Sequence, residues 1–303
     1  VFSMTVSLKT TTPTTNNFSR IFGCIFLQGK RQILCPAIEN FSGKKVLITG
    51  GNAGIGSEIS KALVNAGAQV TSLSRGQSGN IQEDSNINSI YCDLSSPETI
   101  VMAVSKLTAT FDIIICNAGI VAHNYQQTPD GLEQTFATNV FGHHLLYRLL
   151  IEKGMINEGG KIIMTTGEAY LSATDCVPNA SKYNKFEAYG GSKLGNLWQT
   201  RELVRHYPQF QSIAVHPGVI ASGFGIQSKS GIGHWFRERL LISEQQGAQA
   251  SLIAATQPLP QGAYWHNSKG LLTLQDEDVG SDEIKSQLLW LTLESLSRPW
   301  LPN

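Results

Sequence analysis

The sequence predicts an α/β fold in which a doubly wound parallel sheet carries helices on both faces. From Lys44 onward, short apolar runs alternate with segments of helical periodicity, which is the pattern of repeated βαβ units. The runs are apolar along their length, as expected for strands buried on both faces. No internal repeat and no linker rich in proline or glycine divides this region. We therefore expect residues 43–303 to form one domain after an N-terminal extension, residues 1–42.

The order of the elements follows from the periodicity. The first βαβ unit is predicted to have a buried strand at 45–48, a helix at about 57–66 and a second strand at 69–73. Near the C-terminus, Leu289, Leu293 and Leu296 have the spacing of a helix that packs against the core. The further strands are expected at 89–92, 112–116, 161–165 and 212–215.

The segment from 222 to about 246 is irregular and has four closely spaced glycines between 223 and 233, followed by an apolar-aromatic segment around Trp235 and Phe236. We interpret it as a functional flap, because ordinary connections between elements are short. A surface loop with one short helix is the alternative.

Composition excludes several classes of function. The 303 residues include 41% hydrophobic ones, enough for a sizeable core. Lys and Arg together number 23, as do Asp and Glu, so no overall field attracts nucleic acid or an anionic membrane. No apolar run approaches the roughly 20 residues of a membrane span, and the longest one near the N-terminus covers only 21–27. We expect neither a nucleic-acid partner nor a membrane span.

The first 38 residues carry four basic side chains, no acidic one, and many Ser, Thr and Asn residues. This composition fits an organelle transit peptide, and it fits equally a disordered or loosely docked arm, which we favour. The five cysteines are odd in number and lack metal-ligand spacing, which indicates reduced thiols in a reducing compartment. The expected location is intracellular, in the cytoplasm or in an organelle.

The histidines do not suggest a metal site. His143 and His144 lie on an apolar helical segment, and His216 precedes Pro217. No cluster of Cys, His and acidic residues accompanies them in the sequence, so packed or capping histidines are expected and no metal is predicted.

A glycine-rich turn follows the first predicted strand and leads into a helix. Glycines at such a turn allow the backbone to approach a pyrophosphate, whose charge is stabilised by the free N–H groups of the helix N-terminus. The strand, turn and helix in this order predict dinucleotide binding. The candidate residues are Gly50, Asn52, Gly54, Ile55 and Gly56.

The end of the second strand selects between the two nicotinamide dinucleotides. An acidic residue there usually holds the ribose 2′-hydroxyl of NAD, whereas an arginine accommodates the 2′-phosphate of NADP. This chain has Ser74 and Arg75 at that point and no acid. NADP(H) is therefore favoured over NAD(H), with a solvated arginine as the alternative interpretation.

Tyr189 and Lys193 are four residues apart and share one face of a predicted helix. A free phenol has a pKa near ~10, and an adjacent ammonium group is expected to lower it. Tyr189 is then suited to exchange a proton with a substrate oxygen. A chance pair on a solvated helix face is the alternative.

Taken together, these motifs resemble the short-chain dehydrogenase/reductase family over about residues 43–300. The turn has the family's TGxxxGxG form, and Tyr189 with Lys193 matches its YxxxK pair. The resemblance implies a single-domain Rossmann fold. Further matching cofactor positions are Asp93, Leu94, Asn117, Ala118, Gly119, Pro217, Gly218 and Ser222.

Within the family, the chain looks most like the retinol-dehydrogenase-like branch, from the strings at 137–143, 214–219 and 244–249. The resemblance implies that Tyr189 is the general acid/base and that Lys193 lowers its pKa and holds the nicotinamide ribose. It also implies that Asn139 orders a water in the proton relay, and that the protein forms a homo-oligomer.

One family residue is missing. The substrate-orienting serine normally ends the strand at 161–165, and alignment of that strand places Gly167 at the serine position. Thr166, one residue earlier, is the expected substitute, ahead of Glu168, Tyr170 and Ser172. Loss of one such hydroxyl typically costs on the order of 10²–10³ in rate.

The resemblance therefore implies an NADP(H)-dependent carbonyl reductase or alcohol dehydrogenase that acts on an apolar small molecule. Two alternatives stay open. An enzyme of the same fold can use the nucleotide in a non-oxidative or transient-redox reaction, and a protein without the serine can bind the nucleotide without turnover.

Overall fold

One sheet of eight strands organises the protein, in the order β3-β2-β1-β4-β5-β6-β7-β8. The structure is a computed structural model and describes residues 10, 19–21, 23–24, 28, 31–76, 87–178, 180–220 and 241–302. All neighbouring strands are parallel except β8, which is antiparallel to β7. The strands are β1 (Lys45–Thr49), β2 (Gln69–Ser74), β3 (Ile87–Tyr91), β4 (Phe111–Cys116), β5 (Ile156–Thr165), β6 (Gln211–His216), β7 (Tyr264–His266) and β8 (Gly270–Leu272).

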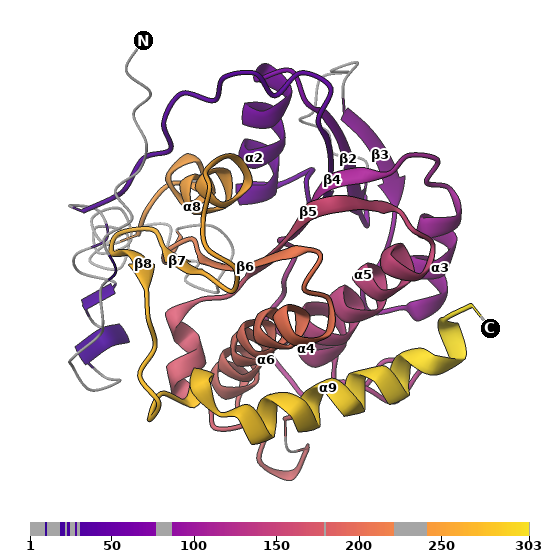
Figure 1. The fold of residues 1–303 in the computed structure, drawn as a ribbon. Coiled ribbons are helices and arrows are strands. Elements are labelled where there is room, and N and C mark those ends of the chain that lie inside the picture. The colour runs from indigo at the N-terminus through magenta and orange to yellow at the C-terminus, as the bar shows by residue number, and fades with distance from the viewer. Residues whose placement is uncertain are drawn as a thin grey trace, which may run out of the picture.

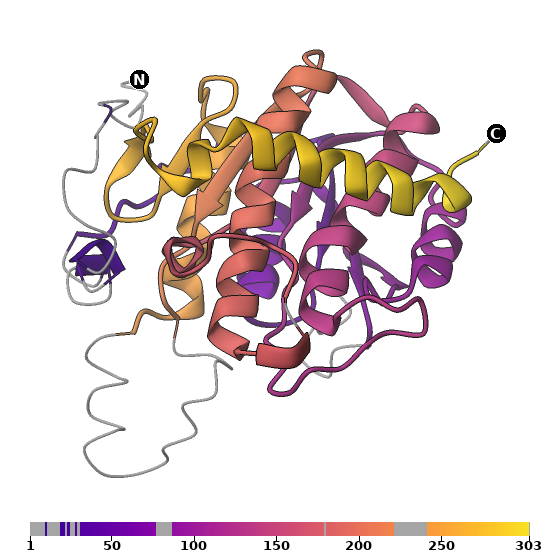
Figure 2. The same ribbon diagram turned by 90° about the horizontal axis from the view of Figure 1, so that it is seen from below.

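Helices cover both faces of this sheet (Figure 1). One face carries α2 and α8, which contact each other, and the other carries α3, α5 and α6. Figure 2 shows α9 crossing the outer side of α6 and α5. The predicted doubly wound parallel sheet is thus confirmed. The helices are α2 (Gly54–Asn65), α3 (Pro97–Ser105), α4 (Gln134–Phe136), α5 (Gly142–Glu152), α6 (Lys185–His206), α8 (Glu244–Thr256) and α9 (Glu283–Ser297).

The two faces of the sheet have separate cores. Strand residues alternate between them, because successive side chains point to opposite faces. Leu47 packs among residues of α3, α5, α6 and α9, whereas Val46 and Ile48 pack among residues of α2 and α8. Leu289 and Leu293 are buried and Leu296 packs against the first of these cores, which confirms the predicted C-terminal helix.

Ion pairs fix α9 to α5. Glu294 accepts hydrogen bonds from His144 Nε2 at 2.9 Å and from Arg148 Nε at 2.6 Å. Burial alone would raise the pKa of Glu294, but these hydrogen bonds outweigh it and lower that pKa to about 2. His144 is therefore a packed, hydrogen-bonded histidine, as expected.

The structure corrects several predicted boundaries. Helix α2 begins at Gly54 because the glycine-rich turn itself enters the helix. Strands β7 and β8 were not predicted, since three residues are too few to show a periodicity. Residues 222–240 of the expected flap, including Ser222, lie outside the described residues. Its last residues, 244–246, form the first turn of α8, where Ser243 and Gln246 make a capping box.

The described residues of the N-terminal extension dock firmly on the domain. Arg20 pairs with Asp278 at 2.6 Å and donates to the Tyr170 hydroxyl at 2.8 Å. Gln28 exchanges two hydrogen bonds with the backbone of Val219, at 2.7 and 2.9 Å. For these residues a disordered or loosely docked arm is the wrong interpretation, because Arg20 and Gln28 are buried. The compartment of the protein stays a prediction.

Within the described ranges, no helix combines the length and apolarity that crossing a bilayer requires.

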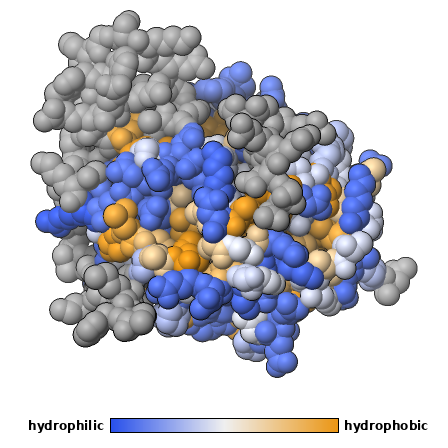
Figure 3. All heavy atoms as spheres, turned by 90° about the horizontal axis from the view of Figure 1, so that it is seen from above, coloured by the Kyte–Doolittle hydropathy of each residue, from blue (hydrophilic) through white to orange (hydrophobic). Residues whose placement is uncertain are grey.

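On the face shown in Figure 3, hydrophobic side chains reach the surface between hydrophilic ones. Three exposed apolar side chains of α9, Ile284, Leu288 and Leu291, are spaced along one side of the helix.

Candidate active site

The predicted site residues gather at the carboxyl ends of β1, β4, β5 and β6. In a parallel sheet these ends share one edge, and the strand order reverses between β1 and β4, where open α/β sheets bind ligands. Thr49 at the end of β1 joins the two strands, since its Oγ1 accepts from the backbone N–H groups of Asn117 and Ala118 at 2.9 and 3.0 Å. Asn117 Nδ2 donates to the Thr49 carbonyl at 3.1 Å.

The glycine-rich turn fits a dinucleotide. Gly50 and Gly54 have φ angles of 67° and 55°, which favour glycine. A Cβ on Gly56 would lie 2.1 Å from the Gly50 carbonyl oxygen, so only glycine allows the turn to fold this closely against α2. Ile55 lies between these glycines, in the first turn of α2. The N-terminus of α2 has no side-chain cap, which leaves its N–H groups for an anion.

Asn52 connects this turn to the end of β2. Its Nδ2 donates to Ser74 Oγ at 2.7 Å and to the Gly76 carbonyl at 3.0 Å. Arg75 lies between these two partners, and it is exposed at the edge of the turn. The structure therefore brings the chain around Arg75 beside the glycine-rich turn.

The residue pair after β3 shapes a neighbouring loop. Asp93 Oδ1 accepts from the backbone N–H and the hydroxyl of Ser95, at 2.9 and 2.8 Å. Leu94 is buried in the core beside α3 and α5. Asp93 and Leu94 thus follow the strand next to β2, on the side of the sheet edge where an adenine is expected.

Tyr189 and Lys193 lie one turn apart in the first half of α6. Asn184 caps this helix, since its Oδ1 accepts from the N–H groups of Phe186 and Glu187. Lys193 Nζ lies 5.3 Å from the centre of the Tyr189 ring and donates to the Thr165 carbonyl at 3.1 Å. The helix closely approaches the 3₁₀ helix Glu168–Ser172, which follows β5, at Gly190, where a Cβ would lie 2.3 Å from Ser172 Oγ.

The pKa values of this pair correct one expectation. Burial raises the pKa of Tyr189 above its ordinary value, whereas an ammonium was expected to lower it. The physical reason is that Lys193 directs its charge to the Thr165 carbonyl, so desolvation of the phenolate dominates. Burial also lowers the pKa of Lys193 to about 8.

Asn139 lies in a π-helical turn, Ala137–Phe141, that leads into α5. Such turns are rare and occur frequently at functional sites. Its side chain exchanges hydrogen bonds with the backbone of Ile120 at 2.8 and 2.9 Å and donates to Ser192 Oγ at 3.0 Å. Asn139 therefore links the loop after β4 to α6. Ser192, between the catalytic candidates, was not singled out in the sequence because serine has no fixed place in the YxxxK pattern.

His143 contacts the backbone of Asn139 from the following turn of the helix. Burial lowers the pKa of His143 to about 4, so its ring is neutral at physiological pH. Its Nδ1 lies 3.0 Å from the Asn139 carbonyl, and its Nε2 lies 2.9 Å from Thr49 Oγ1. The ring connects the ends of β1 and the π-helical turn, so the expectation of a packed histidine is confirmed.

The hydroxyl of Thr166 is used inside the fold. Thr166 is buried, and its Oγ1 donates to the backbone carbonyl of Lys193 at 2.6 Å. At Gly167 the backbone is extended, and an added Cβ would have as nearest neighbour His216 Nδ1 at 3.4 Å, an ordinary contact. The serine position therefore has room for a side chain and carries none.

The other residues that were considered as substitutes for the serine also have internal partners. Tyr170 donates to Asp278 at 2.9 Å, and Ser172 donates to the Ala169 carbonyl at 2.7 Å. Glu168 accepts from Lys269 Nζ at 2.6 Å. None of the four candidates, Thr166 included, presents an uncommitted hydroxyl proton at Gly167.

The segment after β6 completes the edge. Pro217 is buried, and Gly218 has a φ of 96° with the Asn267 side chain 2.4 Å from where a Cβ would be. Gly119, after β4, faces Asn139 and Lys193, which lie 3.5 and 3.6 Å from its Cβ position. The structure thus brings together the candidates on β1, β4, β5, α6 and the segment after β6.

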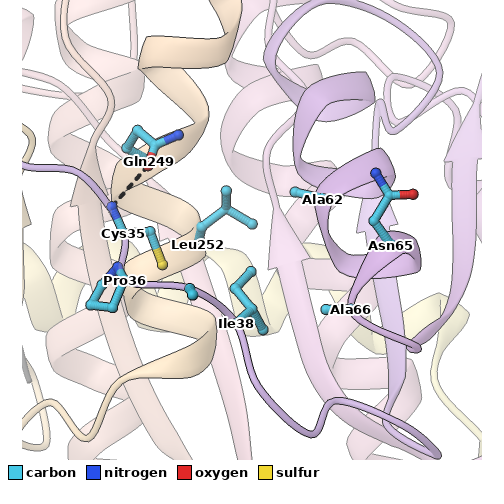
Figure 4. A pocket seen from close by; sticks show the side chains of 9 residues that line it. Cys35, Pro36, Ile38, Ala62, Asn65, Ala66, Gln249 and Leu252 are labelled. Atoms are coloured by element: carbon cyan, nitrogen blue, oxygen red, sulfur yellow. Dashed lines mark hydrogen bonds between the residues drawn. The ribbon is translucent and has the colours of Figure 1, made fainter. Parts of the chain in front are cut away.

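Two surface pockets are lined by residues other than the predicted site residues. One, of about 320 Å³, lies between residues 35–38, α2 and α8 (Figure 4). It adjoins Asn65 and Ala66 at the end of α2, which leads to the start of β2, so it is at the opposite edge of the sheet from the site. A second, of about 280 Å³, is formed by residues 175–178 and the first turn of α6, and includes Ala188 beside Tyr189.

A glycine-rich turn at the switch point and a Tyr–Lys pair on α6 are the arrangement expected of a nicotinamide-dependent oxidoreductase with a Rossmann fold. The chain belongs to the short-chain dehydrogenase/reductase family, since residues 44–232 match the family model described as short chain dehydrogenase. The family match confirms the resemblance on which the site residues were predicted.

The similar proteins specify the branch of the family. The chain is 31% identical over 258 residues to retinol dehydrogenase 12 of Mus musculus. This alignment covers 78% of this chain and 81% of that protein. It is 30% identical over 240 residues to retinol dehydrogenase 11 of Homo sapiens, covering 73% and 76%. The retinol-dehydrogenase-like branch is thereby confirmed.

A solved structure supports the fold alone. A protein from Mycobacterium paratuberculosis superposes with a TM-score of 0.68 at 24% identity, covering 88% of this chain and 98% of that one.

Proposed function

We propose that this protein is an NADP(H)-dependent oxidoreductase that moves a hydride between nicotinamide and an apolar carbonyl or alcohol substrate. The observation that carries the proposal is the placement of Tyr189 and Lys193 at the edge of the sheet where the dinucleotide turn lies. Lys193 Nζ is 5.3 Å from the centre of the Tyr189 ring. Lys193 could serve nucleotide binding alone, but Tyr189 would not need this position in a protein that only binds a nucleotide.

The glycine-rich turn and the N-terminus of α2 would hold the pyrophosphate, and Lys193 would hold the nicotinamide ribose. The preference for NADP(H) rests on Arg75, which is exposed beside Asn52, where a guanidinium would pair with a 2′-phosphate. The bound cofactor would supply or accept the hydride.

Tyr189 would supply the proton. Because burial raises the pKa of Tyr189, the phenol is protonated at neutral pH and is suited to donate to the oxygen of a carbonyl that is being reduced. Lys193, with a pKa of about 8, is largely charged at pH 7 and would stabilise the phenolate that the transfer leaves. Asn139, through Ser192, would hold α6 in place while the proton moves.

The substrate class follows from the branch. Retinol dehydrogenases act, by name, on an apolar alcohol, and we infer that this chain takes an apolar aldehyde, ketone or alcohol. Assembly as a homo-oligomer stays a prediction from the resemblance.

The test is NADPH consumption by the purified protein with a panel of apolar aldehydes and ketones, run with Tyr189→Phe alongside. Turnover in the wild type and its loss in the variant, with NADPH binding retained in both, is the expected result. Equal turnover in both proteins would remove Tyr189 from the mechanism.

A second function is favoured by one observation, the lack of a hydroxyl at Gly167. A protein that binds NADPH saturably but consumes none across the panel would be a nucleotide-binding protein without turnover. Product formed with no net change in the NADP pool would instead indicate a non-oxidative or transient-redox reaction.

A further inference from the structure

Four chemically reactive side chains lie close together next to Gly167, and none of them belongs to the proposed catalytic residues. They are Cys24, Glu168, His216 and His266, and they come from four separate parts of the chain. One potential ligand atom from each lies within 4.8 Å of the others. All four side chains are at least 97% buried. The sequence does not bring these residues together, because the nearest two are 48 positions apart.

The contacts inside the cluster are short but incomplete. Cys24 Sγ lies 3.0 Å from His216 Nε2, and His266 Nε2 lies 3.5 Å from Glu168 Oε1. Two buried polar atoms of the cluster, Glu168 Oε2 and His266 Nε2, have no hydrogen-bond partner among the described residues. Buried polar groups are nearly always partnered, so atoms of this kind in one cluster point to a missing ligand.

We propose that Cys24, Glu168, His216 and His266 form a buried binding site for a zinc-class divalent cation. One thiolate, two imidazoles and a carboxylate are the donors that Zn²⁺ prefers, and four of them fit its tetrahedral structural sites. In such a site the ligand atoms lie roughly 3.3–3.8 Å apart, so small side-chain rotations close the present arrangement around an ion. The negative charges of Cys24 and Glu168 balance the charge of the cation.

Two residues beside the cluster contact its potential ligands. Lys269 Nζ donates to Glu168 Oε1 at 2.6 Å, which leaves Oε2 for the cation. His266 Nδ1 accepts a hydrogen bond from the Ser268 backbone N–H at 3.2 Å and lies 3.3 Å from Ser268 Oγ. Binding of an ion at Nε2 would move the ring proton to Nδ1, where Ser268 Oγ could accept it in place of the N–H contact. Hydrogen bonds of this kind orient metal-binding side chains and raise their affinity.

A cation here would join the N-terminal extension to the edge that carries the active site. Cys24 belongs to the extension, Glu168 follows β5, and His216 and His266 end β6 and β7. His216 also precedes Pro217 and Gly218, which belong to the predicted cofactor site. The ion would therefore hold the extension in place and would fix the start of the segment after β6.

The experiment is a titration of the full-length, chelator-treated protein with Co²⁺, followed by displacement with Zn²⁺. We expect one equivalent of Co²⁺ to bind, with the intense visible absorption of a tetrahedral site and a thiolate-to-cobalt charge-transfer band. Cys24→Ser should lose the charge-transfer band and bind Zn²⁺ more than about 100-fold more weakly. Cys35→Ser is the matched control, because this thiol lies in the same extension but outside the cluster, and it should behave as the wild type.

His266→Gln supplies a second test that does not change the extension. It should weaken Zn²⁺ binding while far-ultraviolet circular dichroism stays unchanged. Less than one tenth of an equivalent bound by the wild type at saturating Zn²⁺ would overturn the proposal. So would an unchanged cobalt spectrum in Cys24→Ser. Because metal binding is read without turnover, these outcomes are independent of the proposed oxidoreductase activity.

Discussion

Thr166 Oγ1 donates a hydrogen bond to the backbone carbonyl of Lys193 at 2.6 Å, and this contact ties the end of β5 to the middle of α6. The hydroxyl that the sequence suggests as a substitute for the missing serine therefore already has a structural partner. Its neighbour Gly167 has the space but no side chain. We therefore expect activity at this edge of the sheet to depend on Tyr189 and on which group, if any, replaces the serine hydroxyl at Gly167.

Thr166→Val tests whether the threonine acts on the substrate. The variant loses a buried hydrogen bond, so we expect the free energy of unfolding to fall by about 1–2 kcal/mol. Because the hydroxyl donates to the Lys193 carbonyl, kcat/KM should change less than tenfold. Urea unfolding and steady-state kinetics check the two effects. A loss of activity on the order of 10²-fold, with NADPH binding intact, would show instead that Thr166 replaces the serine.

Gly167→Ser should increase activity. The extended backbone accepts a side chain without strain, and the nearest atom to the new Cβ is 3.4 Å away. A hydroxyl at this position would steady the substrate oxygen, so kcat/KM for carbonyl reduction should rise on the order of 10²-fold. Gly167→Ala is the matched control, since it adds the Cβ without the hydroxyl and should give no increase. Equal rates in the Ser and Ala variants would contradict the prediction.

NADPH binding should weaken above about pH 8. Burial lowers the pKa of Lys193 to about 8, so the side chain is charged below this pH and neutral above it. The charged form is the one expected to hold the nicotinamide ribose and to stabilise the Tyr189 phenolate. Fluorescence titration of NADPH from pH 6 to 10 should show this loss of affinity as a falling limb of the pH profile above about pH 8. In Lys193→Arg the guanidinium stays charged, so the limb should disappear, and a limb that persists there belongs to another group.

Arg75→Asp should reverse the cofactor preference. The exposed guanidinium beside Asn52 is expected to pair with the 2′-phosphate of NADP, and an acid there would repel it and accept the ribose hydroxyl of NAD. We expect the ratio of the dissociation constants for NAD and NADP to fall by about 10-fold to 100-fold, a loss of one charged contact. Lys106→Asp, an exposed change of the same charge on the far end of α3, is the control. An unchanged ratio would show that Arg75 is a solvated side chain.

Glu294→Gln should destabilise the protein at neutral pH more than at acidic pH. Hydrogen bonds from His144 and Arg148 lower the pKa of Glu294 from 4.5 to about 2, so its stabilising effect is complete above pH 4.5 and is lost as the pH falls toward 2. At pH 7 we expect a loss of about 2 kcal/mol, the range for a hydrogen-bonded charged group.

Urea unfolding of wild type and variant at pH 7 and at pH 3.5 measures this difference. Glu58→Gln, which removes an exposed pair with Lys61, should cost less than about 0.5 kcal/mol and is the control. A difference for Glu294→Gln that grows toward acidic pH would have the wrong sign.

The sequence predicted a parallel sheet, the places of the strands β1 to β6 along the chain and the dinucleotide turn, because these depend on local patterns. A run of three apolar residues, Val46 to Ile48, and the glycines after it determine a strand and a turn without reference to distant residues. Tyr189 and Lys193 meet because a helix repeats every 3.6 residues. The family match then confirmed what these motifs suggested.

What only the tertiary structure decided concerns contacts between distant residues and the solvent around them. The direction of the Thr166 hydroxyl depends on α6, 27 positions away. The pKa of Tyr189 depends on how deeply the ring is buried and on where Lys193 directs its charge, and neither is written in their spacing. Cys24 looks like an isolated thiol until the extension folds back on His216 and His266. Burial and long-range contact arise from the packing of the whole chain, so no local pattern could have specified them.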